Sequence, residues 1–174
     1  MKIDFAKYLS PVFVETGSYV GDGIAEALKA DFRDIYSIEL SPKYYDICKD
    51  RFKSYSNINL VLGDSSVVLY DTIKNIQEKI TFWLDGHYSS GDTACGQYAV
   101  PLIQELEQIK RHPIKHHTIL IDDVRLIRSK RNEFNTFPIS LPEVEDLVKS
   151  INHQYNISYE YGVEDNDILI ATIS

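Results

Sequence analysis

Three acidic residues directly follow two apolar runs in this chain of 174 residues. Asp85 follows ITFWL, and Asp122 and Asp123 follow HTILI. Neither run alternates apolar with polar residues, which predicts two buried strands of a parallel sheet. Ligands of open α/β sheets bind outside the carboxyl ends of the strands, so neighbouring strands would bring the three carboxylates together there. Close carboxylates repel one another unless a cation or a proton intervenes. The residues therefore predict a site for Mg²⁺, or else Mn²⁺ or Ca²⁺, although a single acid of this kind is more typical of a turn cap.

The elements that would position these acids alternate between apolar runs and helical stretches. Strands alternating with helices indicate a parallel sheet, and the short joint 164–166 predicts a hairpin with an antiparallel last strand. Residues 125–140 have an irregular pattern. We expect one domain over 1–174, an α/β, Rossmann-like, doubly wound sheet of seven strands. The pattern predicts strands over 11–15, 34–40, 58–63, 80–85, 117–123, 157–163 and 167–173, and helices ending near 31 and over 42–55, 65–79, 98–111 and 141–152.

Composition and charge argue against several classes of protein. The formal net charge of −8 disfavours a nucleic-acid partner, because such proteins carry a basic surface. No apolar run reaches the length of a membrane span, and the N-terminus lacks the features of a signal peptide. Cys48 and Cys95 form no CxxC pair, which favours a reducing, cytoplasmic setting. Basic residues after the acidic doublet could contact an anionic substrate or form a solvated loop: Arg125, Arg128, Lys130 and Arg131.

A glycine-bearing turn follows the first predicted strand. Glu15 ends that strand, and the turn reads TGSYVGDG over 16–23. Glycines allow a positive φ and a close approach of the backbone to a ligand. The spacing is GxxxGxG rather than the GxGxxG of dinucleotide-binding folds. This difference disfavours a nicotinamide cofactor and leaves a plain strand-to-helix turn as the alternative.

Acids also end the second and third predicted strands. Glu39 lies where a carboxylate can accept hydrogen bonds from both hydroxyls of a ribose. Asp64 could meet the edge of an adenine or, with Ser65, cap the following helix. With Glu15 and Asp85, these acids end four successive strands, a series that favours a ligand site over a purely structural pattern.

The series resembles the class I S-adenosylmethionine-dependent methyltransferases over almost the whole chain. The family's first loop, D/E-x-G-x-G-x-G, matches Glu15, Gly17 and Gly21, with Tyr19 in place of the middle glycine. The resemblance implies a seven-stranded sheet with an antiparallel last strand, and S-adenosylmethionine (SAM) as methyl donor. It implies that residues 17–21 face the methionine part, that Glu39 holds the ribose and that the next acid lies by the adenine. The donor-binding residues implied are Glu15, Gly17, Ser18, Tyr19, Gly21, Glu39, Asp64 and Ser65.

A closer resemblance is to the metal-dependent O-methyltransferases of the macrocin and catechol types. The segments WLDGHYS at 83–89 and ILIDD at 119–123 are similar to those that end the fourth and fifth strands in these enzymes. The macrocin type implies Asp85, Asp122 and Asp123 as metal ligands. It also implies metal-assisted O-methyl transfer, but the substrate class does not carry over with the resemblance. A metal that holds two oxygens of the acceptor would suit a small molecule such as a sugar, a vicinal diol or a catechol. His87 stands where that type has a second acid, and no lysine matches the base of the catechol type.

His87 and Asp85 are the predicted catalytic residues. Neutral imidazole suits a general base, but His87 could also be a fourth metal ligand or a loop histidine without a role. The alternative function is a non-catalytic Rossmann-like module that binds a nucleoside or a metal. The sequence predicts neither the methyl acceptor nor the oligomeric state.

The sequence also predicts the positions of a tryptophan, a loop segment and three histidines. Trp83 is expected in the core, because it lies inside a strand. The loop segment 91–93 is expected to close over the substrate as a lid, since glycines flank it. Three histidines before the fifth predicted strand are expected on the surface, away from the site: His112, His116 and His117.

Overall fold

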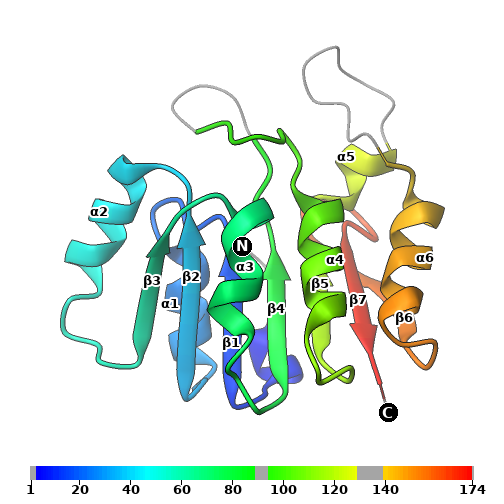
Figure 1. Ribbon diagram of the computed structural model, residues 1–174, viewed down its shortest axis with the longest axis horizontal. Coiled ribbons are helices and arrows are strands. Elements are labelled where there is room, and N and C mark those ends of the chain that lie inside the picture. Colours follow the sequence, from blue (N-terminus) through cyan, green and yellow to red (C-terminus); the bar gives the residue numbers. More distant parts are fainter. Residues whose placement is uncertain (1–2, 89–93, 129–138, 174) are drawn as a thin grey trace.

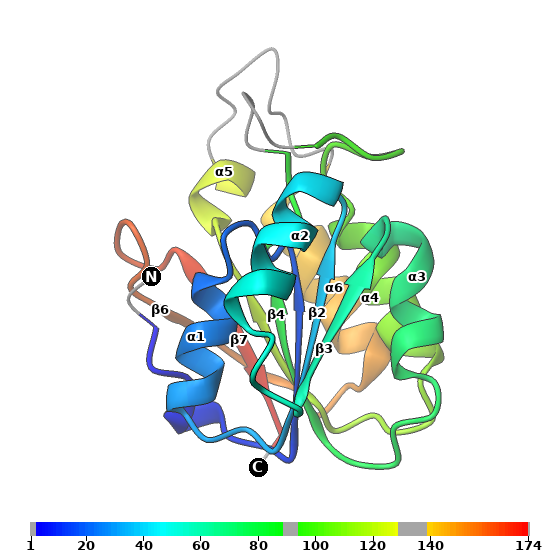
Figure 2. The ribbon, with the colours of Figure 1, turned by 90° about the vertical axis from the view of Figure 1, so that its left-hand side faces the viewer.

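A seven-stranded sheet forms the centre of the computed structural model, and helices cover both of its faces (Figure 1, Figure 2). The structure describes residues 3–88, 94–128 and 139–173. The strand order is β3-β2-β1-β4-β5-β7-β6, and β7 is antiparallel to both of its neighbours while β1 to β5 are parallel. The predicted Rossmann-like sheet with an antiparallel last strand is confirmed. The strands are β1 (Val12–Thr16), β2 (Asp34–Glu39), β3 (Ile58–Leu62), β4 (Ile80–Leu84), β5 (Thr118–Ile121), β6 (Asn156–Glu160) and β7 (Ile168–Thr172).

The helices lie close to the predicted ranges, with differences at their ends. The helix α3 ends earlier than predicted, in a turn where the Ile76 N–H donates to the Ile73 carbonyl at 2.9 Å. The helix α4 begins only after Pro101, because proline disfavours helical backbone in the residue before it. Within the described ranges, none of the helices combines the length and apolar character needed to cross a bilayer. The helices are η1 (Phe5–Tyr8), α1 (Asp22–Lys29), α2 (Pro42–Arg51), α3 (Ser65–Ile73), α4 (Leu102–Arg111), α5 (Val124–Arg128) and α6 (Leu141–Ile151).

The short helix α5 lies in a stretch that was expected to be irregular. Its first N–H groups bond to a residue far along the chain. The Val124 N–H donates to the Asp167 carbonyl at 2.8 Å, and the Arg125 N–H donates to Asp167 Oδ1 at 2.9 Å. Asp167 thus satisfies the free donors at the start of the helix. The helix α5 is therefore stabilised at its start by the residue before β7, and the local sequence alone does not predict it.

Two apolar clusters hold the helices against the sheet, one on each face. The helices α1 and α2 pack on the face that includes Trp83 and Leu120, whereas α3, α4 and α6 pack on the face that includes Phe82 and Ile119. Successive strand residues point to opposite faces, which places Phe82 and Trp83 in different clusters. Trp83 is 1% exposed and its ring meets Phe5 edge-on, so its predicted place in the core is confirmed.

Two histidines near the amino end of β5 are buried and not on the surface. His112 and His117 are both 0% exposed, and Nε2 of His117 lies 2.9 Å from Nδ1 of His112. The surface prediction was wrong for these two residues, because their ring nitrogens find hydrogen-bond partners in the interior. His116 is exposed, as predicted.

Candidate active site

A cavity of about 520 Å³ runs along the carboxyl ends of the strands, a size typical of small-ligand sites. Nine predicted site residues line it: Gly17, Tyr19, Glu39, Asp64, Ser65, Asp85, His87, Asp122 and Asp123. Three others, Glu15, Ser18 and Gly21, are not among its lining residues. The cavity is also lined by the aromatic residues Tyr44, Tyr88 and Tyr98, which were not predicted as site residues, since isolated tyrosines carry no motif.

Pairing between β1, β4 and β5 fixes the positions of the acids. The Asp85 N–H donates to the Thr16 carbonyl at 3.2 Å, and the Asp122 N–H donates to the Leu84 carbonyl at 3.1 Å. Each acid therefore continues the hydrogen bonding of its strand beyond the last strand residue. Gly17 has a φ of +86°, and a Cβ there would lie 2.5 Å from the Asp85 carbonyl oxygen. Only glycine can bring the turn after β1 this close to the end of β4.

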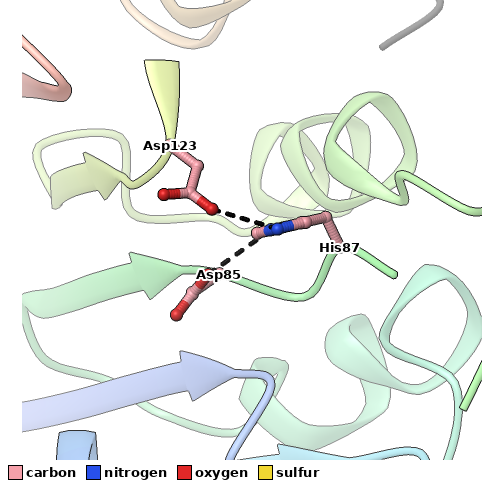
Figure 3. Close-up of side chains that lie close together, drawn as sticks. All are labelled: Asp85, His87 and Asp123. Atoms are coloured by element: carbon pink, nitrogen blue, oxygen red, sulfur yellow. Dashed lines mark ion pairs between the residues drawn. The ribbon is translucent and has the colours of Figure 1, made fainter. Parts of the chain in front are cut away.

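His87 lies between two carboxylates, and both ring nitrogens face one (Figure 3). Its Nε2 is 3.0 Å from Asp123 Oδ2, and its Nδ1 is 3.5 Å from Asp85 Oδ1. Burial alone would lower the pKa of His87, but the hydrogen bonds to Asp123 and Asp85 outweigh it and raise the pKa to about 10. Burial likewise opposes ionisation of Asp123, yet His87 and Arg125 hold its pKa below the usual value. The imidazole is therefore protonated near neutral pH.

The other acids at this end of the sheet are poorly compensated. Burial raises the pKa of Asp85. Burial, together with the negative charges of Asp85 and Asp123, raises the pKa of Asp122 to about 7. The Asp122 Oδ1 accepts the Asp123 N–H at 2.8 Å, which only partly offsets these effects. The cluster as a whole favours uptake of a cation or a proton.

Two groups of described residues could hold a metal ion, each with ligand atoms within 4.8 Å of one another: Asp85, His87 and Asp123, and Asp122, Asp123 and Asp167. In the second group, the Arg125 guanidinium bonds to Asp123 and also to Asp167 Oδ2, at 2.5 Å. The positive charge of Arg125 therefore already compensates part of the negative charge of that group. The predicted ligands Asp85, Asp122 and Asp123 all line the cavity, but the first group has His87 in place of Asp122.

Glu39 is held at the other part of the cavity by two backbone groups. Its Oε2 accepts the Tyr19 N–H at 2.8 Å, and its Oε1 accepts the Ser41 N–H at 2.7 Å. Each carboxylate oxygen has a second lone pair. Glu39 can therefore accept hydrogen bonds from two neighbouring hydroxyls of a ligand while the backbone holds it in place.

Asp64 both caps a helix and lines the cavity. Its Oδ1 accepts the Ser66 N–H at 2.9 Å as the N-cap of α3, and its Oδ2 accepts the Gln97 N–H, also at 2.9 Å. A Cβ at Gly96 would overlap Asp64 Oδ2, so the chain before α4 passes close to this carboxylate. Of the two interpretations of Asp64, the helix cap is present, and the adenine contact stays a prediction.

Glu15 is buried beneath the glycine turn and outside the cavity. It is 1% exposed, and Ser37 Oγ donates to its Oε1 at 2.5 Å. Ser37 also hydrogen-bonds to Ser18 in the turn. Burial raises the pKa of Glu15 to about 8, so the carboxyl is mostly protonated at neutral pH. Gly21 is packed as tightly, since a Cβ there would lie 2.5 Å from the Phe52 ring. Glu15, Ser18 and Gly21 therefore hold the conformation of the glycine turn without lining the cavity.

Some sequence predictions concern positions that the structure does not describe. The lid predicted at 91–93 lies outside the described residues, as do Lys130 and Arg131. Arg125 is described, and it pairs with Asp123 and Asp167. Asp167 was not predicted as part of this end of the sheet, because a single acid before a strand resembles an ordinary turn residue.

Comparison with known proteins shows the fold. No family model matches the chain, and no curated protein matches it. Solved structures do match. A methyltransferase from Podospora anserina with bound S-adenosylhomocysteine (SAH) has a TM-score of 0.64 at 12% identity, over 98% of this chain and 74% of that one. An O-methyltransferase from Bacillus cereus in complex with SAH has a TM-score of 0.62 at 12% identity, over 98% and 77%.

A third neighbour differs in the kind of substrate that its name indicates. The fibrillarin pre-rRNA processing protein of Methanococcus jannaschii has a TM-score of 0.60 at 18% identity, over 98% of this chain and 68% of that one. The fold alone therefore does not decide the acceptor. At these identities the likeness concerns architecture, and the macrocin-type resemblance stays a prediction. The chain has the fold of the S-adenosylmethionine-dependent methyltransferases.

Proposed function

We propose that this chain is a SAM-dependent methyltransferase that acts on a hydroxyl of a small molecule with the help of a divalent metal ion. The observation that carries the proposal is one cavity with two chemically different parts. A backbone-held carboxylate, Glu39, lies at the end of β2, and an under-compensated acidic cluster lies at the ends of β4 and β5. The first part suits a ribose, and the second suits a cation and an acceptor.

The strand order gives the orientation of the donor in this proposal. With the ribose at Glu39 on β2, an extended nucleoside reaches β3 on one side and β1 on the other. At the β3 side of the cavity, Asp64 and Ser65 would lie beside the base. At the β1 side, Gly17 has no side chain, so its backbone beside Asp85 stays accessible to the donor. The sulfonium methyl group would thus face the acidic cluster.

The donor set at the cluster fits a divalent ion. Asp85, His87 and Asp123 offer two carboxylate oxygens and one imidazole nitrogen, a mixed set that suits Mn²⁺ as well as Mg²⁺. These three residues would hold the metal, which would position the acceptor and lower the pKa of its hydroxyl when bound. The imidazolium of His87 supplies positive charge at this place when no metal is bound.

The residues of the chain then have separate roles. Glu39 and the turn at Gly17 hold the donor in line with the acceptor oxygen, and such positioning supplies most of the catalysis. Asp122 lines the cavity beside the metal ligands and accepts the proton of the hydroxyl. As the new carbon–oxygen bond forms, the carbon–sulfur bond breaks, and SAH leaves as a neutral thioether.

Calorimetry with SAH tests the proposal. Wild type should bind SAH, and Glu39→Ala should weaken binding by about 1.5–3 kcal/mol, the scale for hydrogen bonds to a charged group. The matched control is Glu107→Ala, at an exposed position of α4, which should bind like wild type. Absence of SAH binding by wild type, or equal affinities for wild type and Glu39→Ala, would contradict the proposal.

A further inference from the structure

Glu105 is a buried acid that the proposed mechanism leaves without a role. It projects from α4, is 1% exposed and is not among the residues that line the 520 Å³ cavity. Its Oε1 lies directly behind Gly86, where a Cβ would approach it to 2.9 Å. Burial raises the pKa of Glu105 to about 7, against the hydrogen bonds from Ser65 and Thr16. An ionisable group is seldom buried this completely without a specific partner.

One partner of Glu105 is a residue of the cavity wall. Ser65 lines the cavity, and its Oγ donates to Glu105 Oε1 at 2.6 Å. One turn further along α4, Gln108 Nε2 donates to the Ser65 carbonyl at 2.9 Å, and Gln108 Oε1 accepts the Tyr70 N–H at 2.8 Å. The helices α3 and α4 lie side by side on one face of the sheet (Figure 1). α4 therefore fixes both the backbone and the hydroxyl of Ser65.

The direction of the Ser65 bond has a chemical consequence. A serine hydroxyl has one hydrogen and two lone pairs. Above its pKa, Glu105 is ionised and can only accept, so it takes the hydrogen of Ser65. Ser65 Oγ then offers the cavity lone pairs alone, and it can accept a hydrogen bond but not donate one. The 6-amino group of adenine is a donor, whereas a 6-oxo group in the same place is an acceptor.

We infer that Glu105 is a positioning residue that fixes Ser65 as an acceptor and so makes the site select a 6-amino purine nucleoside over its 6-oxo analogue. The inference rests on the proposed function, in which the base of the donor lies at the end of β3 beside Ser65. Glu105 itself does not touch the ligand. It acts through one hydrogen bond, and the selectivity arises because a 6-oxo group would meet a lone pair with no hydrogen between them.

The test compares the affinities of two ligands, SAH and S-inosylhomocysteine, which carries hypoxanthine in place of adenine. Wild type should prefer SAH. Glu105→Met keeps the length of the side chain but accepts no hydrogen bond, so the Ser65 hydroxyl is free to turn and donate to the 6-oxo group. The preference for SAH should then fall by about 3- to 10-fold, the scale of one neutral hydrogen bond. Glu105→Gln should keep most of the preference, because its carbonyl oxygen can still accept from Ser65.

A double-mutant cycle shows whether Glu105 acts through Ser65. Ser65→Ala should lower the preference as Glu105→Met does, and the double variant should lower it no further. Ser65→Ala also keeps the test valid if Glu105→Met does not fold. Equal weakening of both ligands in Glu105→Met, or a wild type that does not discriminate between them, would overturn the inference and leave the proposed function standing. A wild type that binds neither ligand would overturn both.

Discussion

The two ends of the sheet each hold a cluster of titratable side chains, and the clusters differ in how fully their hydrogen bonds and charges are matched. At the amino end, His112 and His117 are completely buried. At the carboxyl end, Asp85, His87 and Asp123 surround part of an open cavity. Water normally solvates all of these groups, so removing them from water requires compensation.

The histidine pair is compensated within the protein. The Ile80 N–H donates to His117 Nδ1 at 3.1 Å, so the hydrogen of the neutral ring is on Nε2. That Nε2 lies 2.9 Å from His112 Nδ1, and His112 Nε2 lies 3.2 Å from the Ile73 carbonyl and 3.1 Å from the Ile76 carbonyl. Donation in one direction therefore satisfies all four ring nitrogens while both rings stay neutral.

The acidic cluster is not compensated in this way. One imidazolium, His87, stands between Asp85 and Asp123, and Asp122 beside them has a pKa raised to about 7 by burial and by its two acidic neighbours. Burial of polar groups therefore does not by itself mark a functional site. A matched cluster stabilises the fold, whereas an unmatched one is retained at the expense of stability where a ligand completes it.

Replacing His117 should have the largest effect on stability of the changes considered. Leucine has a similar volume but accepts no hydrogen bond, so the buried Ile80 N–H loses its partner and His112 loses a donor. Each buried group without a partner costs about 1–3 kcal/mol, and His117→Leu should lower the unfolding free energy by about 2–4 kcal/mol in urea denaturation at pH 8. The exposed control His116→Leu should change it by about 0.5 kcal/mol or less. Equal effects would show that the pair is not a matched cluster.

The same histidine should make part of the stability sensitive to acid. Burial, followed by the neighbouring basic residues His112, His116, Lys115 and Lys79, lowers the pKa of His117 to about 3. A histidine in the unfolded chain has a pKa of about 6.5. The unfolded state therefore binds the proton first, and stability is lost as the pH falls from about 6.5 toward 3. The gap between wild type and His117→Leu should be widest above pH 6.5 and should narrow below it.

At the carboxyl end, an added metal ion should stabilise the folded protein, because it supplies positive charge that the acidic cluster lacks. Mn²⁺ at 100 times its dissociation constant should raise the unfolding free energy by about 2.7 kcal/mol, or the Tm by roughly 5–10 °C for a chain of this size. Asp85→Asn/Asp123→Asn should lose this shift. Asp122→Asn should keep it if His87 completes the ligand set. Loss of the shift in Asp122→Asn would support the three aspartates predicted from the sequence instead.

Variants of His87 separate its possible roles within the same measurement. His87→Ala should weaken Mn²⁺ binding if the imidazole is a ligand, and should leave it unchanged or strengthen it if His87 is a general base or has no role, because a competing positive charge is then removed. His87→Asp replaces a nitrogen donor with an oxygen donor, so it should move the preference of the site from Mn²⁺ toward Mg²⁺. An unchanged order of the two metals in His87→Asp would argue against ligation by His87.

The positions of the acids could be predicted because they depend on local patterns. Continuous apolar runs identify β4 and β5 as buried strands, and parallel neighbours end at the same edge of the sheet. The acids that follow, Asp85 and Asp122, therefore had to approach one another. The same reasoning placed Glu39 at the end of β2, where it lines the cavity.

The partners of these residues could not be predicted, because they come from distant parts of the chain. The start of α5 depends on Asp167, and the burial of His117 depends on the Ile80 N–H of another strand. Glu105 is an acidic residue on a helix, and acidic residues are exposed in most proteins. Only the packing of α3 against α4 gives it Ser65 as a partner. A single sequence without its contacts cannot distinguish such a residue from a surface acid.

The smallest of the predicted effects has the opposite sign to that of His117→Leu. Asp122→Asn should stabilise the metal-free protein by about 1–2 kcal/mol at pH 8. The amide removes the charge that Asp85 and Asp123 repel, and its oxygen can still accept the Asp123 N–H. Urea denaturation in the presence of a chelator would measure the gain. The exposed control Asp165→Asn should change the stability by about 0.5 kcal/mol or less.

The pH dependence of this gain tests its cause. The pKa of Asp122 is about 7 in the folded chain and about 3.9 for an unfolded aspartate. Between these values the folded state holds a proton that the unfolded state has released, so the contribution of wild-type Asp122 to stability rises as the pH falls from 7 toward 4. The advantage of Asp122→Asn should therefore be greatest above pH 7 and vanish near pH 4, whereas the effect of His117→Leu begins to shrink only below pH 6.5. If Asp122→Asn instead destabilises the protein at pH 8, the carboxylate belongs to a matched cluster, and the contrast between the two ends of the sheet does not hold.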